Sequence, residues 1–181
     1  MIGEPRFVQE RLGRHHDRAS FSCTREPALH TYFTDPRRAL RENERNIAAV
    51  YVLLDTAVAR RVAGFFTISN ATVIPSSIPP KIAKRLPRYD SWGCVKLGRM
   101  ARDDRYVNHG LGPILVARAF AVALSISESS GSFAMIVDAK NEILTAWYQT
   151  LGFERFVDRA RTLFVTNATM AEYLRLSAAG L

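Results

Sequence analysis

A long apolar segment near the middle of the chain limits what this sequence can fold into. Residues 114–126 (ILVARAFAVALSI) form the longest apolar run of the 181 residues, and Arg118 interrupts it. A membrane-spanning helix needs about 20 consecutive apolar residues, which is more than this run supplies. We therefore expect a buried helix in the core of a globular domain, and no membrane as a partner.

The residues just before this helix are typical of an anion-binding loop. Gly110 and Gly112 remove side chains where a backbone wraps closely round a ligand, and Pro113 suits the first helical turn. Free N–H groups at a helix N-terminus attract anions. The loop lacks the Gly-Lys-Ser/Thr of a Walker loop and the third glycine of the dinucleotide fingerprint. Taken alone, it is equally compatible with a simple turn.

The rest of the chain predicts a mixed α/β protein. Patterns rich in β-branched and aromatic residues predict strands at 6–12, 47–55, 62–70, 94–101, 132–138, 153–157 and 162–166. Two helices are expected between Thr24, as the N-cap, and Arg45, separated at Pro36. Further helices are expected at 81–86, at 141–151 with Asn141 as cap and Gly152 after the end, and from Ala168 onward.

The charge of the chain favours an acidic partner. The sequence has 25 Lys and Arg residues against 17 Asp and Glu residues, a formal net charge of +8. Such an excess favours nucleic acid, phosphorylated cofactors or an anionic surface. Eight basic and three acidic residues lie between Lys81 and Arg105. This segment is either a solvated face or a platform for nucleic-acid phosphates.

Cysteine usage and the N-terminal segment indicate a cytoplasmic protein. Cys23 and Cys94 are too few for a disulfide framework, so we expect two reduced thiols. The first 16 residues are charged and lack the apolar region of a signal peptide. The run His15-His16-Asp17 could suggest a metal site, but the sequence offers no matching ligand cluster elsewhere. We expect a solvated loop there and no bound metal.

Several segments occur in the order found in a known family. The Gly110-x-Gly112 loop and the apolar helix are followed by a buried strand, by Asn141, and by Tyr148 four residues before Gly152-Phe153. This order resembles the GNAT acetyltransferases, in which the loop holds the pyrophosphate of acetyl-coenzyme A (acetyl-CoA).

A narrower resemblance runs from about Arg18 to Phe164. Its segments are Phe21-Ser-Cys23 with Leu29, Ile78-Pro-Pro80, Arg85-Leu-Pro-Arg-Tyr89, Leu97-Gly-Arg-Met-Ala101, Val137-Asp-Ala139 and Trp147-Tyr148. In combination they are similar to the GNAT toxins of bacterial toxin–antitoxin modules.

The resemblance implies a fold, an activity and partners. The fold is a single α/β (α+β) GNAT-like domain over residues 1–181, with a mixed, mainly antiparallel sheet and helices on both faces. The activity is transfer of acetyl from acetyl-CoA to the α-amino group of aminoacyl-tRNA, which blocks translation. The partners are a ribbon-helix-helix antitoxin, operator DNA through that antitoxin only, and a second copy of the chain in a homodimer.

The resemblance also assigns site residues. The backbone of Met100 and Ala101 supplies an oxyanion donor and pairs with the pantetheine arm. Asn141 contacts the cofactor, caps its helix, or does both. Residues expected to bind acetyl-CoA are Met100, Ala101, Arg102, Val107, Asn108, His109, Gly110, Leu111, Gly112, Pro113 and Asn141. Residues expected to bind tRNA are Lys81, Lys84, Arg85, Arg88 and Arg99.

Tyr148 is the candidate catalytic residue. An α-amino group has a pKa of roughly 7.7–8.0, so much of it is already neutral near pH 7.5 and needs no strong protein base. Tyr148 matches the position of the family's general acid, and a phenol with a pKa of about 10 stays protonated. The alternative is a core aromatic residue, because Leu144, Trp147 and Tyr148 fall on one helix face.

Two other functions stay open at this point. One is a GNAT enzyme that acetylates a small amine or a protein N-terminus. A small cationic amine would favour an acidic pocket, and the sequence has no acidic cluster near the site motifs. The other is a non-catalytic GNAT fold that only binds acyl-CoA, against which Tyr148 and the two loop glycines argue.

Overall fold

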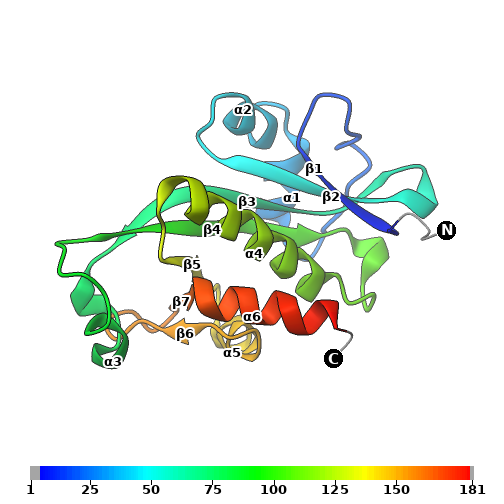
Figure 1. The fold of residues 1–181 in the computed structure, drawn as a ribbon. Helices are drawn as coiled ribbons and strands as arrows, with labels where there is room; N and C mark the ends of the chain where they lie inside the picture. Colours follow the sequence, from blue (N-terminus) through cyan, green and yellow to red (C-terminus); the bar gives the residue numbers. More distant parts are fainter. Residues whose placement is uncertain (1–4, 180–181) are drawn as a thin grey trace. The chain divides into compact units, whose positions relative to one another are not determined.

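The computed structural model describes residues 5–179, which divide into two compact units. The first unit contains residues 5–69 and 99–118, and the second contains residues 70–98 and 119–179. The described strands form one seven-stranded sheet in the order β1-β2-β3-β4-β5-β7-β6. Strands β3 and β4 and helix α4 contribute residues to both units, and each unit is described in turn (Figure 1).

The first unit is an antiparallel half-sheet with two short helices. Its elements are β1 (Phe7–Arg11), α1 (Pro27–Thr34), α2 (Ala39–Glu44), β2 (Ala49–Asp55), the 3-10 turn η1 (Thr56–Val58), most of β3 (Arg61–Val73), the end of β4 (Trp92–Arg102), the 3-10 turn η3 (Asp104–Tyr106) and the start of α4 (Leu111–Ser130). Strand β1 pairs with β2, β2 pairs with β3, and α2 lies along β2 (Figure 1).

An aromatic stack forms the core of this unit. The rings of Phe33 and Phe65 lie parallel with centroids 4.4 Å apart, and the Phe21 ring meets Phe33 edge-on at 4.7 Å. All three side chains are fully buried. Such pairs add about 0.5–1.5 kcal/mol beyond the burial of apolar area. The stack therefore fixes α1 and the segment before it against β3.

The second unit contains the parallel strand pair. Its elements are η2 (Pro75–Ser77), α3 (Pro80–Ala83), β5 (Ala134–Asp138), α5 (Glu142–Thr150), β6 (Glu154–Arg155), β7 (Thr162–Thr166) and α6 (Asn167–Ala178), with the first part of β4 and most of α4. Strand β5 pairs parallel with β4 and antiparallel with β7. The Phe120 ring of α4 contacts Phe153 and Tyr173.

Most expected elements are confirmed, including the mixed, mainly antiparallel sheet, the edge strand β1 and the helix break at Pro36. Both cysteines are free and buried, and burial raises the pKa of Cys23 to about 11. That residues 1–181 form a single domain stays a prediction. Helix α4 has 20 residues, more than the apolar run in the sequence. By length and composition alone it could cross a membrane, but the core helix of a soluble protein meets the same two criteria.

Three local predictions are wrong. Thr24 does not cap α1, because Glu26 is the N-cap residue and the Thr24 hydroxyl donates to Asp104 instead. Strand β6 has two residues rather than five, since the chain pairs with β7 only at Glu154 and Arg155. Helix α3 begins at Pro80 and ends at Ala83, so the basic residues that follow lie outside it.

The end of α5 gives a testable prediction. Gly152 has φ +92°, a left-handed conformation that disfavours side chains, and a Cβ there would lie 2.8 Å from Cγ2 of Thr169. Gly131 has φ +69° with open space around it. In urea unfolding we expect Gly131→Ala to cost about 1 kcal/mol, the conformational penalty alone. We expect Gly152→Ala to cost about 2–3 kcal/mol because a steric penalty is added.

The steric part can be removed separately. Thr169→Ser deletes Cγ2 and keeps the hydroxyl that contacts Thr166. Gly152→Ala combined with Thr169→Ser should regain stability toward the Gly131→Ala value. Equal costs for the two glycine variants would contradict this account of α5.

Candidate active site

The end of β4 holds the first group of predicted site residues. Gly98 and Arg99 are both exposed, so the usual alternation of buried and exposed residues stops there. The Arg99 backbone N–H donates to Oγ1 of the buried Thr67 at 2.7 Å. Met100, Ala101 and Arg102 follow and are half-buried. The Arg99 N–H thus has a side-chain acceptor from β3 at this strand end.

A glycine on the neighbouring strand brings this strand end close. A Cβ on Gly64 would lie 3.0 Å from the Ala101 carbonyl oxygen and 3.1 Å from Cδ1 of Leu115. The missing side chain at Gly64 therefore allows the end of β4 and the first part of α4 to pack closely against β3.

Arg99 is held by a cluster that sequence analysis missed. Its guanidinium lies 4.1 Å from the Tyr32 ring centroid and 3.5 Å from the Glu42 carboxylate. The Tyr32 hydroxyl donates to Glu42 at 2.8 Å, and burial together with Glu42 raises the pKa of Tyr32. Tyr32 and Glu42 come from α1 and α2, so no local sequence pattern connects them with Arg99.

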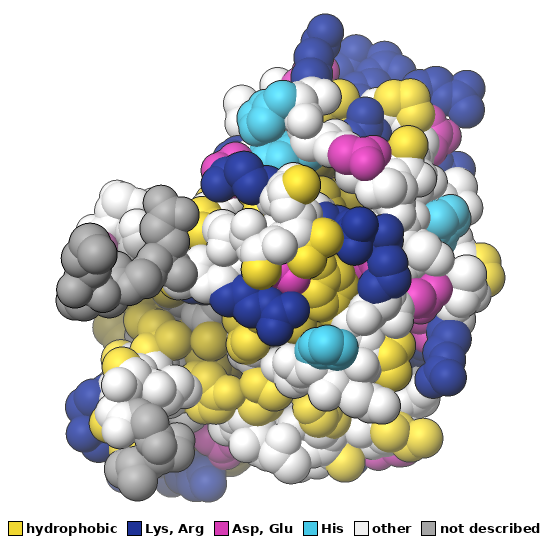
Figure 2. Space-filling model, turned by 90° about the vertical axis from the view of Figure 1, so that its right-hand side faces the viewer, with side chains coloured by type: hydrophobic (Ala, Val, Ile, Leu, Met, Phe, Trp, Pro, Cys, Tyr) yellow, Lys and Arg dark blue, Asp and Glu magenta, His cyan; other side chains and the backbone are white. Residues whose placement is uncertain are grey.

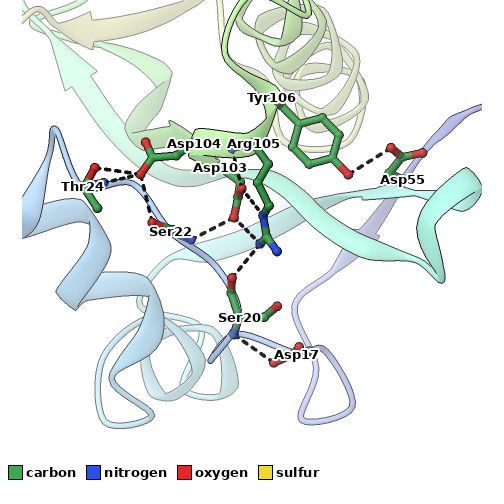
Figure 3. Close-up of polar contacts among 9 residues, drawn as sticks. All are labelled: Asp17, Ser20, Ser22, Thr24, Asp55, Asp103, Asp104, Arg105 and Tyr106. Carbon is green, nitrogen blue, oxygen red and sulfur yellow. Dashed lines mark hydrogen bonds and ion pairs between the residues drawn. The ribbon is translucent and has the colours of Figure 1, made fainter.

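The connection from β4 to α4 is fixed by buried carboxylates (Figure 3). Asp103 is fully buried and accepts hydrogen bonds from the Arg105 guanidinium, at 2.6 and 2.7 Å, and from the Ser22 backbone N–H. Asp104 accepts from the Ser22 hydroxyl and from both the hydroxyl and the backbone N–H of Thr24. Burial opposes ionisation of Asp103, but these donors hold its pKa below the usual range.

A second buried carboxylate holds the other side of the same connection. The Tyr106 hydroxyl donates to Asp55 at 3.0 Å, and Arg6 contacts Asp55 at 3.2 Å. Asp55 is fully buried, and despite that burial these donors lower its pKa. Tyr106 therefore has little freedom, and the loop that follows it starts from a fixed point.

That loop leads directly into α4, as predicted. Asn108 and Gly110 adopt left-handed backbone conformations, with φ of 66° and 69°, and are exposed together with His109. Helix α4 begins at Leu111, which places Gly112 and Pro113 in its first turn. The first N–H groups of a helix have no partner within it and carry its positive dipole end. The segment from Val107 to Pro113 is thus chemically suited to bind phosphate.

Helix α5 carries the candidate acid. The Asn141 side chain caps the helix by accepting from the Leu144 N–H at 2.9 Å, as predicted. Tyr148 is buried, with its ring 4.9 Å from Trp147 and 5.2 Å from Phe153. Burial raises the pKa of Tyr148 to about 12. The sequence predicts that Leu144 shares a helix face with Trp147 and Tyr148. In the structure Leu144 is exposed, and Thr145 is the other buried residue of α5 besides Tyr148.

The other predicted basic residues are exposed in the second unit. Lys81, Lys84, Arg85 and Arg88 all face solvent, and Lys81 lies 3.7 Å from Glu154. Lys84 and Arg88 line a hollow of about 560 Å³ whose other residues are mostly apolar. Arg99, by contrast, belongs to the first unit.

The histidine pair meets an acid that precedes it in the chain. The His16 ring contacts Glu10 at 3.1 Å, and His15 lies 3.6 Å from the same oxygen. Nδ1 of His16 accepts from the Gly13 N–H, so a neutral ring carries its proton on Nε2, which donates to Glu10. The Glu10 carboxylate and the two imidazole rings bring three ligand atoms within 4.8 Å of one another, a group able to hold a metal ion that sequence analysis did not find.

Comparison with known proteins gives consistent similarities. No protein-family model matches the sequence. A tRNA-acetylating toxin of Mycobacterium tuberculosis is 28% identical over 144 residues, which cover 80% of this chain and 82% of that protein.

Two solved structures extend the similarity to the fold. AtaT complexed with acetyl-methionyl-tRNAfMet matches with a TM-score of 0.82 and 28% identity, covering 92% of this chain and 98% of that one. A tyrosine-to-phenylalanine mutant of AtaT, bound to acetyl-CoA and to the C-terminus of the antitoxin AtaR, matches with a TM-score of 0.75 and 25% identity, covering 93% and 98%.

The sheet, the loop before α4 and these similarities define the class of protein. The chain has the GNAT fold of these toxin structures. Within that class it is a homologue of the tRNA-acetylating toxins.

The buried Asp103 gives a testable prediction. Asp103→Asn removes the charge that Arg105 and the Ser22 N–H require, so we expect a loss of about 2 kcal/mol in the free energy of unfolding at pH 7. Because folding lowers the pKa of Asp103, its contribution is complete above the unfolded value near 3.9 and is lost as the pH falls further. The difference between wild type and variant should therefore shrink below about pH 4.

Glu172→Gln serves as the control, since it removes an acid from an exposed pair with Arg175 and should cost less than about 0.5 kcal/mol. An Asp103→Asn variant as stable as this control at pH 7 would contradict the anchoring role.

Proposed function

We propose that this protein is a toxin-type N-acetyltransferase that transfers acetyl from acetyl-CoA to the α-amino group of aminoacyl-tRNA and so blocks translation. The observation that carries the proposal is the match, over 92% of the chain, to AtaT in its complex with acetyl-methionyl-tRNA. The net charge of +8 supports a nucleic-acid substrate.

Most of the groups assigned to acetyl-CoA belong to the first unit, and Asn141 belongs to the second. The loop residues Val107, Asn108, His109, Gly110, Leu111, Gly112 and Pro113 provide backbone N–H groups and a helix dipole for the pyrophosphate. The backbone of Met100 and Ala101 is assigned to the pantetheine arm and to the oxyanion, Arg102 to the phosphates, and Asn141 of α5 to a further contact. The bound cofactor supplies an activated acetyl thioester.

Tyr148 is assigned the role of general acid. Because burial raises its pKa to about 12, its hydroxyl holds a proton at every physiological pH and can give it to the leaving thiolate. The attacking α-amino group loses its own proton to solvent, since its pKa of roughly 7.7–8.0 leaves much of it neutral. A separate protein base is therefore not required.

The basic side chains of both units are assigned to the tRNA. Lys81, Lys84, Arg85 and Arg88 are exposed, as phosphate-contacting residues must be. Arg99 is held in place by Tyr32 and Glu42, which limits the side-chain entropy lost when it binds. Contacts of this kind position an RNA without reading its sequence.

The proposal extends to partners and location. The similarity to an AtaT–AtaR complex supports an antitoxin that binds this protein. We assign that antitoxin to the ribbon-helix-helix class, with operator DNA bound through it, and we assign the toxin to a homodimer in the cytoplasm.

The direct test uses radiolabelled acetyl-CoA with bulk charged tRNA, deacylated tRNA and free amino acids in parallel. We expect label on charged tRNA alone. Deacylated tRNA has no α-amino group, and free amino acids lack the RNA phosphates that the basic residues are assigned to bind. Label on free amino acids, or none on charged tRNA from protein that binds acetyl-CoA, would contradict the proposal.

The acid is tested by Tyr148→Phe, with Tyr173→Phe of α6 as the matched control. We expect kcat to fall about 100-fold or more in the first and to stay near wild type in the second, because a general acid contributes at least about that factor. KM for acetyl-CoA should change little in either variant.

The wild-type pH profile provides a second readout for Tyr148. The rate should rise through the amine pKa of roughly 7.7–8.0 and show no falling limb up to about pH 10, because the pKa of Tyr148 is raised to about 12. A falling limb near pH 9 in wild type, absent from Tyr148→Phe, would show a phenol that ionises far earlier than its burial predicts.

A further inference from the structure

Arginine side chains surround a hollow on α2 that none of the site assignments uses. Arg14, Arg18, Arg37, Arg41 and Arg45 line this hollow of about 580 Å³, which we name the arginine hollow. All five belong to the first unit, from the loop after β1 and from α2 with its flanking residues. Lys and Arg side chains gather at the top of the face in Figure 2, the end at which Figure 1 draws α2.

The charge of the arginine hollow is only partly compensated. Glu44 is the one acidic residue that lines it, and it pairs with Arg14 at 2.7 Å. Arg37 pairs with Asp35 at 3.2 Å. Within residues 5–179, Arg41 and Arg45 form no ion pair, and both are exposed. The Nε atom of Arg18 is buried without a hydrogen-bond partner in that same part of the chain.

The residue type that lines the hollow suits phosphates. Arg41 lies in α2, Arg45 is the C-cap residue of that helix and Arg37 precedes its N-cap residue, and all three line the hollow. Guanidinium groups bind phosphate oxygens in pairs, and the residues here are all arginine rather than lysine.

Charged side chains outnumber apolar ones in the lining of the hollow. Pro36 and Leu40 are its only apolar residues, and Leu40 is 8% exposed. A docked peptide helix would need an apolar groove to receive its anchoring side chains. A polyanion with regularly repeated charges needs only the guanidinium groups.

Helix α2 also connects the hollow with the end of β4. Glu42, on the same helix, contacts Arg99 and the Tyr32 hydroxyl. One short helix therefore presents Arg41 to the hollow and, through Glu42, supports Arg99, two residues before Ala101.

We propose that the arginine hollow binds backbone phosphates of the substrate RNA, as a docking site separate from the acetyl-transfer groups. The proposal deepens the proposed function and rests on tRNA being the substrate. It adds five arginines of the N-terminal segment and α2 to the basic residues assigned above. The contacts carry no base information, so the site should bind charged and deacylated tRNA alike.

The test compares the double variant Arg41→Gln/Arg45→Gln with Arg159→Gln/Arg175→Gln. The control removes two exposed arginine charges from the second unit. Fluorescently labelled deacylated tRNA is titrated with each protein between 50 and 200 mM salt. Since the α2 side chains are exposed, folding should be unaffected, which circular dichroism and thermal unfolding check.

We expect the α2 variant to bind tRNA about tenfold more weakly than the control at low salt. The slope of log K against log salt should decrease by about 2, one for each lost phosphate contact. With charged tRNA, KM should rise by about the same factor while kcat stays near wild type.

Two results would overturn the proposal. One is tRNA affinity and salt slope equal to those of the control. The other is unchanged tRNA binding with lost binding of a labelled poly-glutamate peptide, which would assign the hollow to an acidic polypeptide. If wild type binds tRNA through the hollow but does not acetylate charged tRNA, the proposed function fails while the docking site stands.

Discussion

The connection between β4 and α4 depends on burying two ionised carboxylates, Asp55 and Asp103. A buried charge is costly unless it is paired and hydrogen-bonded. Asp55 accepts from Arg6 and Tyr106, both distant in the chain, whereas Asp103 accepts from the nearby Arg105 and from the distant Ser22 N–H. Breaking such a pair leaves an uncompensated charge, so the donors and the acids must stay together. The loop that is proposed to bind phosphate follows Tyr106, which lies between these two anchors, and its geometry follows from them.

In the proposed function, this anchoring preorganises the groups of the first unit that are assigned to acetyl-CoA. The groups assigned to acetyl-CoA are mainly backbone N–H groups at the end of β4 and the start of α4. Their directions are set by the contact of the Arg99 N–H with Thr67, by the missing side chain at Gly64 and by the buried acids. Preorganised dipoles of this kind need no reorganisation when charge develops. The one side chain assigned to the chemistry, Tyr148, contributes a proton that burial keeps in place.

Features set by neighbouring residues could be predicted from the sequence. The Gly110-x-Gly112 loop, the Asn141 cap and the stop at Gly152 each depend on a few adjacent residues, and the structure places all three as predicted. Contacts between distant residues could not. Threonine is a common N-cap residue, but both the hydroxyl and the backbone N–H of Thr24 donate to Asp104, 80 residues away. Arg37, Arg41 and Arg45 lie close together in the sequence, whereas Arg14 and Arg18 join them only through folding.

The central claim concerns one atom, the α-amino nitrogen of an amino acid esterified to tRNA. It is tested most directly by incubating charged tRNA with the protein and acetyl-CoA, digesting the RNA with a nuclease, and identifying the 3′-terminal aminoacyl-adenosine by mass spectrometry. The account predicts aminoacyl-adenosine heavier by one acetyl group, with fragments that place the acetyl on the α-amino nitrogen. Unmodified aminoacyl-adenosine, or acetyl found on a base or a ribose, would contradict it.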